Sequence, residues 1–563
     1  MKRIVHYTLL FVVIIFAAAS CKKSAPNQTK YIPKDAMFVF DMDWKSLSEK
    51  AAKGNINWDS LFKSVADEGD DSAIAQGRKL MEDFKNSGVD MESNLFFFLK
   101  IGGSMMNGQS ATGGIVAGMK DAGMFENYIK KQPGAGEIKK ESNYSYISIG
   151  NDFTVGWNKD VVILSGSGMQ GGSATAPASN TAPQTLAALF SQKEEESVAA
   201  IPEFLDLMTE KADMLVWTNS GTMMNAVPLL GLTKFADLLK DSFGAGAINF
   251  EDGKLVGNFK SYSGKDLADI WKKYAGPTVN MDMVNQYPTP LTGFAAFSFN
   301  PEIIKEIIKF GGMEATANQY MQQMGFTLDD ITKAFKGDFV IAFSDFGIKE
   351  TENDYGGMKY KSKTPVGKLV FNATIGDKAA YDKIVAKLAE MGEMEMKNGQ
   401  YVPKGMGDYI SWNMNGKNLV VATDTELMQQ YLAAKGNAAV PEDVASQSKG
   451  KSIAFYFDIN KILQAIPADS AYLQTSESAK ATFKNVIVTS DNFNGKYVGS
   501  NFELRTMNDK ENSLVTLVKF ISQAAKQAAE EEKRYSMGGM SDMDMSAMDT
   551  TQMVMPPVEE PAK

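Results

Sequence analysis

Alternating apolar positions mark four short segments as half-buried strands, and each segment leads towards a helical pattern. Phe455, Phe457 and Ile459 show the alternation clearly, because they occupy every second position of one segment. The four segments span residues 37–44, 214–219, 294–301 and 453–460. The same strand-to-helix start therefore occurs four times along the chain.

Polar side chains at the ends of three of these segments suit the first turn of a helix. Asp43, Asn300 and Asn460 stand where the strand pattern ends, and their side chains can accept hydrogen bonds from free backbone N–H groups. Pro301 occupies the first helical position, which proline favours. We predict that the three polar residues are structural helix caps.

Later segments carry hairpin signals and helices with one apolar stripe. Asp252-Gly253 and Asn494-Gly495 are two-residue turn signals between apolar runs. After the second strand of each hairpin, apolar residues recur at helical spacing, as in Leu267, Ile270 and Trp271. Hairpins interrupted by helices predict an α+β fold, with mostly antiparallel sheets that carry helices on one face.

The chain also repeats itself. Three segments of the first half recur in the same order in the second half, 242 to 256 residues later. The matched starting positions are Asp121 with Asp377, Trp157 with Trp412, and Gly253 with Gly495. We interpret the body as a tandem duplication of two modules, A and B.

Composition and repeats together predict the domain organisation. Stretches rich in Gly, Ser, Ala, Thr and Pro separate the modules and are typical of flexible linkers. The predicted order is a signal peptide at 1–20, a tether at 21–30, module A at 31–165, a linker at 166–195, module B at 196–277, a repeat of module A at 287–432, a linker at 433–450, a repeat of module B at 451–526, and a disordered methionine-rich acidic tail at 530–563.

The first 21 residues have the form of an export signal. Lys2 and Arg3 precede a short apolar run, and the small residues at 17–20 lead into Cys21, the only cysteine. About a dozen apolar residues are too few to span a bilayer, which needs about 20. The pattern resembles a bacterial lipobox, whose cysteine becomes diacylated, so we expect Cys21 to anchor the protein in membrane lipid.

The rarest residues limit the chemistry. His6 and Cys21 both lie in the first 21 positions, so a processed and acylated chain would contain neither histidine nor a free thiol. This excludes Ser-His-Asp and Cys-His catalysis, zinc sites built from those residues, and disulfides. The net charge of −10 argues against nucleic acid as a partner. No cofactor is predicted.

Two patterns remain as candidate functional sites: a pair of aspartates and a row of methionines. Asp41 and Asp43 share one face of a strand and could form an acid/base pair. Their counterparts are Ser298 and Asn300 in one module and Asp458 and Asn460 in another. Because asparagine caps a helix as well as aspartate does but cannot exchange protons, this comparison favours helix capping for the pair. The second pattern is a row of methionines in the tail, whose thioethers could bind Cu(I), although a disordered low-complexity tail in a methionine-rich chain is the favoured interpretation. These candidate metal ligands are Met537, Met540, Met543, Met545 and Met548.

The start of the body resembles a known group. Residues 31–47 contain Ile-Pro-Lys-Asp-Ala, a strand, an Asp-capped helix start and Lys-Ser-Leu. This opening is similar to that of a family of Bacteroidota lipoproteins catalogued as a domain of unknown function. The resemblance implies an envelope protein and supplies no catalytic residues. Lys22-Lys23-Ser24 lacks the acidic residues that follow the cysteine in surface-exposed members, which favours the periplasmic side of the outer membrane over the cell surface.

Two functional classes follow from these patterns. The first is a lipid-anchored binding or structural protein without catalytic activity, whose partner is an envelope protein, lipid or glycan. The alternative is a carboxylate-dependent hydrolase that acts on envelope glycans. Binding of Cu(I) by the methionine-rich tail is a third, minor hypothesis.

Overall fold

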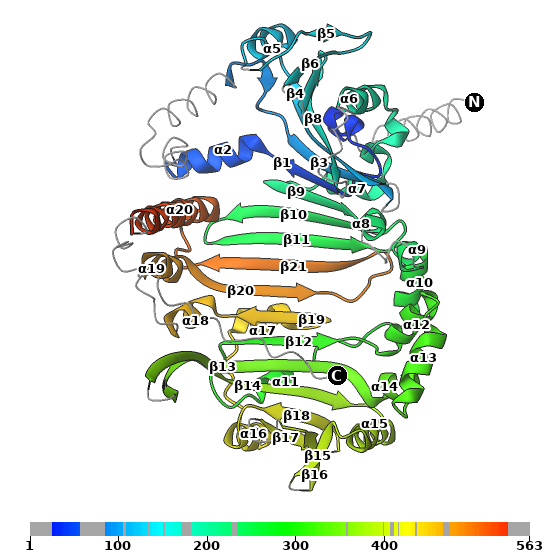
Figure 1. Ribbon diagram of the computed structural model, residues 1–563, viewed down its shortest axis with the longest axis vertical. Helices are drawn as coiled ribbons and strands as arrows, with labels where there is room; N and C mark the ends of the chain where they lie inside the picture. Colours follow the sequence, from blue (N-terminus) through cyan, green and yellow to red (C-terminus); the bar gives the residue numbers. More distant parts are fainter. Residues whose placement is uncertain are drawn as a thin grey trace, which may run out of the picture.

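One antiparallel sheet runs through both halves of the chain in the computed structural model (Figure 1). The structure describes residues 25–56, 85–104, 108–132, 134–149, 153–170, 182–226, 234–355, 358–397, 399–405, 410–414, 416–433, 436–465 and 473–538. Every pairing between strands of the sheet is antiparallel, in agreement with the predicted α+β class.

The first half contributes the strands from one edge of the sheet to its middle. In spatial order these are β5 (Lys139–Lys140), β6 (Ser145–Ile149), β7 (Phe153–Trp157), β8 (Val161–Gln170), β4 (Gly108–Met119), β3 (Leu95–Ser104), β1 (Phe38–Met42), β9 (Met214–Asn219), β10 (Phe243–Glu251) and β11 (Lys254–Tyr262). The short strand β2 (Val89–Asp90) pairs with the end of β4.

The second half continues from the middle to the other edge. Its strands follow the order β21 (Tyr497–Thr506), β20 (Phe483–Ser490), β19 (Ile453–Phe457), β12 (Gly293–Ser298), β13 (Phe335–Tyr355), β14 (Met358–Ile375), β18 (Asn418–Ala422) and β17 (Ser411–Met414). A separate hairpin is formed by β15 (Met394–Lys397) and β16 (Gln400–Pro403).

The two halves meet along β11 and β21, and strand order is equivalent on either side of that pair. Counted outward, β10, β9, β1, β3, β4, β8 and β7 correspond to β20, β19, β12, β13, β14, β18 and β17. Trp157 and Trp412 lie in the equivalent strands β7 and β17. Asp121 and Asp377 both cap helices that follow equivalent strands.

The third matched pair shows a difference between the halves. Gly253 and Gly495 both precede the strands of the central pair and have positive φ angles, which glycine adopts without strain. However, Tyr497 pairs with Tyr262, an odd number of residues after Leu255, so Tyr497 and Leu255 point to opposite faces. A two-residue turn precedes β11, whereas six residues separate β20 from β21. This difference in turn length accompanies the change of face, by which matched residues of β11 and β21 are out of phase by one position.

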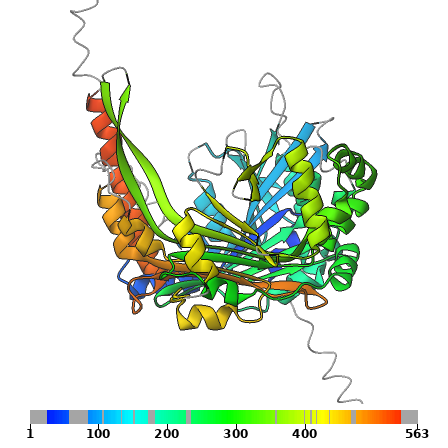
Figure 2. The same ribbon diagram turned by 90° about the horizontal axis from the view of Figure 1, so that it is seen from below.

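Helices lie along both ends of the strands and over both faces (Figures 1 and 2). They are α2 (Trp44–Lys53), α5 (Ala122–Ile129), α6 (Ala182–Ser191), α7 (Pro202–Leu207), α8 (Ser220–Ala226), α9 (Phe235–Leu238), α10 (Lys265–Lys273), α11 (Met281–Asn285), α12 (Glu302–Phe310), α13 (Glu314–Gln323), α14 (Leu328–Ala334), α15 (Lys378–Glu390), α16 (Thr425–Leu432), α17 (Glu442–Ser448), α18 (Ile459–Ala465), α19 (Leu473–Thr482) and α20 (Ser513–Gly538), with the 3-10 turns η1 (Asn27–Tyr31), η2 (Glu194–Glu196) and η3 (Val198–Ala200).

The prediction that helices cover only one face is wrong. Val116 and Ala117 are neighbours on β4 and point to opposite sides of the sheet, yet both are buried in apolar cores. The core around Val116 includes side chains of α6 and α7, whereas the core around Ala117 includes α5. A second large core, on the same face as that around Val116, packs α11, α16 and α17 against the strands of the second half.

Both predicted linkers contain ordered secondary structure. Residues 166–170 belong to β8, and α6 buries Leu186 and Phe190, whose ring stacks on Tyr144 at 4.4 Å between centroids. Residues 433–450 contain α17, whose Val444 is buried. The composition is that of a linker, but a few apolar residues at helical spacing are enough to dock each segment. The tail prediction was also too long at its start, because α20 continues to Gly538.

The second half carries one extension that the sequence patterns did not predict. The β13–β14 hairpin continues past the rest of the sheet as a two-stranded arm (Figure 2). It begins at a register shift between Ser344 and Gly347, where Asp345 has a φ of 52°. Lys359 pairs with Glu352 and Lys361 lies near Glu350 along the arm.

Candidate functional site: an aromatic pocket at the centre of the sheet

Apolar side chains cover the face of the sheet opposite the two largest cores. We call this surface the aromatic face and define it by Phe40, Phe97, Phe297, Phe339, Phe455 and Phe457. Register shows that Phe297 lies between Phe339 on β13 and Ile453 on β19. Phe297 is 38% exposed, an unusual position for a large apolar side chain in the middle of a sheet.

A pocket of about 500 Å³ opens where the aromatic face meets α10. Trp271 and Tyr274, from α10 and its C-terminal end, line one side, and the strand residue Phe297 lines the other. The remaining aromatic side chains of the lining are Phe299, Phe339 and Phe493. The pocket therefore draws on both halves of the chain, because α10 follows β11 whereas the floor comes from β12, β13, β19 and β21.

The end of β12 gives the floor its shape. Phe299 N donates a hydrogen bond to the carbonyl oxygen of Gly337 at 3.1 Å, and the Phe299 ring stacks on Phe339 with 5.7 Å between centroids. Gly337 has a φ of 95°, and a Cβ atom there would lie 1.8 Å from the Phe299 carbonyl oxygen. Only glycine fits this position, so Gly337 permits the approach that sets Phe299 in the floor.

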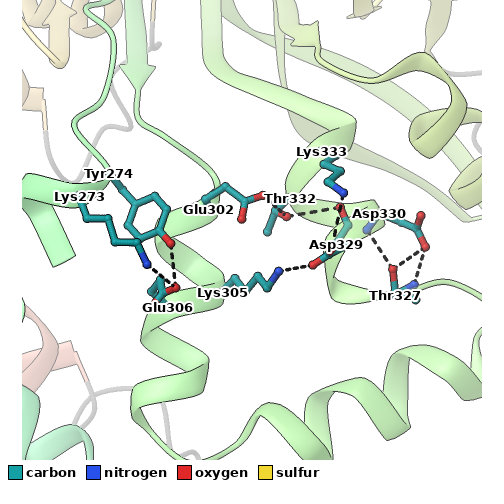
Figure 3. Close-up of polar contacts among 10 residues, drawn as sticks. All are labelled: Lys273, Tyr274, Glu302, Lys305, Glu306, Thr327, Asp329, Asp330, Thr332 and Lys333. Atoms are coloured by element: carbon teal, nitrogen blue, oxygen red, sulfur yellow. Dashed lines mark hydrogen bonds and ion pairs between the residues drawn. The ribbon is translucent and has the colours of Figure 1, made fainter.

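A polar network holds α10 against α12 (Figure 3). The Tyr274 hydroxyl donates a hydrogen bond to Glu306 Oε1 at 2.8 Å, and Lys273 Nζ lies 3.2 Å from the same oxygen. The hydrogen bond from Tyr274, together with Lys273, holds the pKa of Glu306 below its usual range. The Tyr274 ring thus lines the pocket, while its hydroxyl group forms a hydrogen bond that connects the end of α10 to α12.

The network continues from α12 to α14 (Figure 3). Lys305 forms an ion pair with Asp329 and holds the pKa of that carboxyl below its usual range. Thr332 Oγ1 donates a hydrogen bond to Glu302 at 2.8 Å. Thr327 and Asp330 form a capping box at the start of α14. These contacts support the outer wall of the pocket and do not line it.

Several polar side chains of the pocket lining already form hydrogen bonds with other groups of the protein. Lys451 Nζ lies 2.6 Å from Asp491 Oδ1, and Ser452 Oγ donates to the carbonyl oxygens of Ser490 and Asp491 at 3.1 and 2.9 Å. Asn492 Nδ2 donates to the carbonyl oxygen of Pro277 at 3.3 Å. Among the described residues of the lining, Asp491 is the only charged one, and it forms an ion pair with Lys451.

The predicted caps behave differently at the three positions. Asp43 accepts a hydrogen bond from Ser46 N at 2.9 Å and caps α2. Asn300 Oδ1 accepts from Glu302 N at 3.1 Å and also lines the pocket. The assignment of Asn460 as a cap is wrong. It lies inside α18 and donates to the carbonyl oxygens of Lys480 and Phe483, while the side chain of Asp458 accepts from Lys461 N.

Asp41 and Asp43 have separate partners. Asp41 is buried in β1, and both of its carboxylate oxygens accept hydrogen bonds from Asn94 Nδ2, at 3.0 and 2.8 Å. Burial raises the pKa of Asp41 to about 7, against the opposing effect of the Asn94 hydrogen bond. Asp43 lies beyond the strand at the start of α2. Neither carboxylate lines the central pocket.

The predicted lipid and metal residues lie largely outside the described residues. This holds for Cys21 and for four of the five methionines, Met540, Met543, Met545 and Met548. Met537 belongs to the last turns of α20. In the part of the chain that the structure describes, no helix is both long and apolar enough to cross a bilayer.

A second concavity lies in the first half. It encloses about 790 Å³ beside α6 and is lined by polar as well as apolar residues, among them Lys34, Asp35 and Lys100. Lys100 Nζ lies 2.8 Å from Asp35 Oδ2, so two of these charges neutralise each other. The mixed lining defines no single ligand chemistry, in contrast to the central pocket.

The sequence patterns contained part of the pocket without revealing it. Trp271 lies on the predicted apolar stripe of α10. The stronger signal was in residues 294–299, where positions on both faces are apolar, although an ordinary half-buried strand has one polar face. Which strands would meet α10 depends on pairings between residues more than 200 positions apart.

Comparison with known proteins assigns the chain to a family. A family model described as Domain of unknown function (DUF4836) matches residues 28–514, and the chain belongs to that family. The match confirms the expected assignment to a domain of unknown function. The comparison with curated proteins gave no match.

Some solved structures are similar over part of the chain. Crystal form IV of TP0453 matches with 10% identity and a TM-score of 0.25, over 42% of this chain and 81% of that one. Crystal form III gives 9% identity and the same TM-score, over 42% and 80% of the two chains. Similarity at this level carries no argument about fold or function.

Proposed function

We propose that this protein is a non-catalytic binding protein of the cell envelope, anchored through acylated Cys21 to the outer membrane and facing the periplasm, and that the central pocket binds an apolar ligand. The observation that carries the proposal is the pocket itself. Its volume falls within the range of about 300–1,000 Å³ that is typical of small-molecule sites. The surface of its lining is mainly apolar and combines aromatic rings with serine, asparagine and aspartate residues.

The chemistry of the lining favours binding over hydrolysis. A glycosidase needs two carboxyl groups about 5–9.5 Å apart, one of them free to donate a proton. Within the described part of the chain, the pocket lining contains one carboxylate, Asp491, and Lys451 already holds it in an ion pair. Asp41, whose raised pKa would suit a general acid, is buried against Asn94 elsewhere.

The test is the binding of N-phenyl-1-naphthylamine, an uncharged fluorophore whose emission rises in apolar surroundings. The mature protein is expected to bind it saturably, and Phe297→Ser is expected to weaken binding about tenfold or more, because it removes a large apolar contact from the pocket. Phe40→Ser is the matched control. Phe40 occupies the equivalent strand and the same face in the first half, outside the pocket. Absence of saturable binding, or equal loss in both variants, would contradict the proposal.

A further inference from the structure

We infer that the central pocket accepts a single acyl chain that carries an uncharged polar head, with the chain against the aromatic lining and the head at Ser490–Asn492. This inference rests on the proposed function and specifies the ligand class of the same site. It follows from three properties of the lining: which side chains are apolar, how the polar atoms are already bonded, and where the charges lie.

The apolar lining favours a hydrocarbon chain over a sugar. A sugar carries many hydroxyl groups, and each one that loses water needs a partner in the site. Along the body of the pocket the surfaces are rings, including Trp271, Phe297 and Phe339. These groups offer few hydrogen bonds, whereas a hydrocarbon chain loses unfavourable contact with water against them.

Most polar residues of the lining lie together, because Ser298 N donates to the carbonyl oxygen of Ser452 and Ser452 N to that of Ser490, whereas Ser261 lies apart on β11. This grouping gives the ligand a direction. Ser490, Asp491 and Asn492 follow one another at the end of β20, and Ser452 lies beside them at the start of β19. Several of their atoms already bond to the backbone or to each other. This end can therefore accommodate a small head with one or two hydroxyl or amide groups.

The charge distribution favours an uncharged head. A carboxylate or phosphate head would lie beside Asp491, the one charged residue among the lining residues that the structure describes, and Lys451 is already engaged by that side chain at 2.6 Å. A cationic head would have to displace Lys451 from the ion pair. An uncharged head meets neither cost.

Competition against the bound fluorophore tests this inference with three amphiphiles of equal chain length, each used below its aggregation threshold. 1-Palmitoylglycerol is expected to displace the probe, whereas palmitate and hexadecylamine should need concentrations about tenfold higher. Maltotriose is expected to displace nothing. If a charged amphiphile competes as well as the neutral one, or if maltotriose competes, the inference is wrong.

The variant Lys451→Met tests whether the ligand head binds beside Asp491. This variant leaves Asp491 without its cation, so hexadecylamine is expected to bind about tenfold more tightly while 1-palmitoylglycerol is unchanged. Lys254→Met serves as the control, because Lys254 lies near Glu503 on the central strands, outside the pocket lining. An equal response to hexadecylamine in both variants would overturn the placement of the head.

The two proposals fail in different ways. Failure of the wild-type protein to bind the fluorophore would contradict the proposed function. Saturable binding that Phe297→Ser weakens, with no displacement by any C16 amphiphile, would leave the binding function standing and overturn only the assignment to an acyl chain.

Discussion

At the scale of single residues, the ionisation of buried Asp41 makes the free energy of unfolding depend on pH. Burial raises its pKa from 3.8 to about 7, so the folded state holds a proton that the unfolded state has released between these values. Its contribution to stability is therefore greatest at low pH and falls as pH rises through this window. Asn94 offsets part of the cost by donating to both carboxylate oxygens.

We predict that Asp41→Asn removes this pH dependence. The free energy of unfolding of the wild-type protein should fall by about 2 to 3 kcal/mol more than that of the variant between pH 5 and pH 8, at 1.36 kcal/mol per pKa unit. Urea unfolding at both pH values measures the difference. Parallel pH profiles for the two proteins would show that Asp41 ionises normally in the folded state.

Asp43 allows a test of capping against acid/base chemistry. Its side chain accepts the hydrogen bond from Ser46 N, and asparagine can do the same. Asp43→Asn is expected to leave stability nearly unchanged, whereas Asp43→Ala should lose about 1 kcal/mol. Thermal or urea unfolding separates the outcomes, and a large loss in the asparagine variant would mean that the charge itself matters.

At the scale of elements, the pocket wall depends on one contact between helices. The Tyr274 hydroxyl bonds to Glu306, and this bond connects α10 to α12. Since α10 carries both Trp271 and Tyr274, loosening it changes the pocket without removing an aromatic ring.

We predict that Tyr274→Phe weakens fluorophore binding by less than Phe297→Ser does and lowers the free energy of unfolding by about 1 kcal/mol, the typical contribution of one hydrogen bond. Tyr320→Phe is the control, because Tyr320 lies on α13 and is 66% exposed. Fluorescence titration and urea unfolding measure the two effects. Unchanged binding in Tyr274→Phe would show that the hydroxyl group has no role in positioning the wall.

Local sequence patterns predicted helices, strands and caps whose contacts join neighbouring residues better than they predicted contacts between residues far apart in the sequence. Asp43 lies at a strand-to-helix junction whose hydrogen bonds connect neighbours in sequence, so it could be predicted. The prediction for Asn460 failed because Asp458, two positions earlier, suits the same cap, and because the carbonyl groups that accept from Asn460 Nδ2 lie 20 or more residues away. The helix α6 was missed because its Gly- and Ser-rich surroundings outweighed four buried residues in the pattern.

At the scale of the whole molecule, the central pairing joins parts of the chain that no local pattern connects. Gly257 pairs with Phe502 across the middle of the sheet, and the pocket forms beside this junction. Repeated motifs could predict that two halves exist, but they could not show that the halves share one sheet. The pocket could not be predicted from either half alone, since α10 comes from one half and its floor from the other.

Equivalent strand order leads to a prediction about the repeat. An experimental structure should allow β1, β9 and β10 to superpose on β12, β19 and β20, with Trp157 falling near Trp412. The central strands β11 and β21 should superpose only after a shift of one residue, because their side chains alternate out of phase. If the outer strands match only in order and differ in direction of twist or spacing, the duplication is wrong.

The last prediction concerns how the whole molecule is held at the membrane. The proposed attachment is through lipid at Cys21. Two acyl chains are enough for stable anchoring, whereas a single chain binds reversibly. Cys21→Ser should therefore move the protein from the membrane fraction to the soluble periplasmic fraction and abolish incorporation of labelled palmitate. Fluorophore binding should be unchanged, because the pocket lies in the folded body. A variant that stays in the membrane fraction would show that another surface, for which the aromatic face is the first candidate, attaches the protein to lipid.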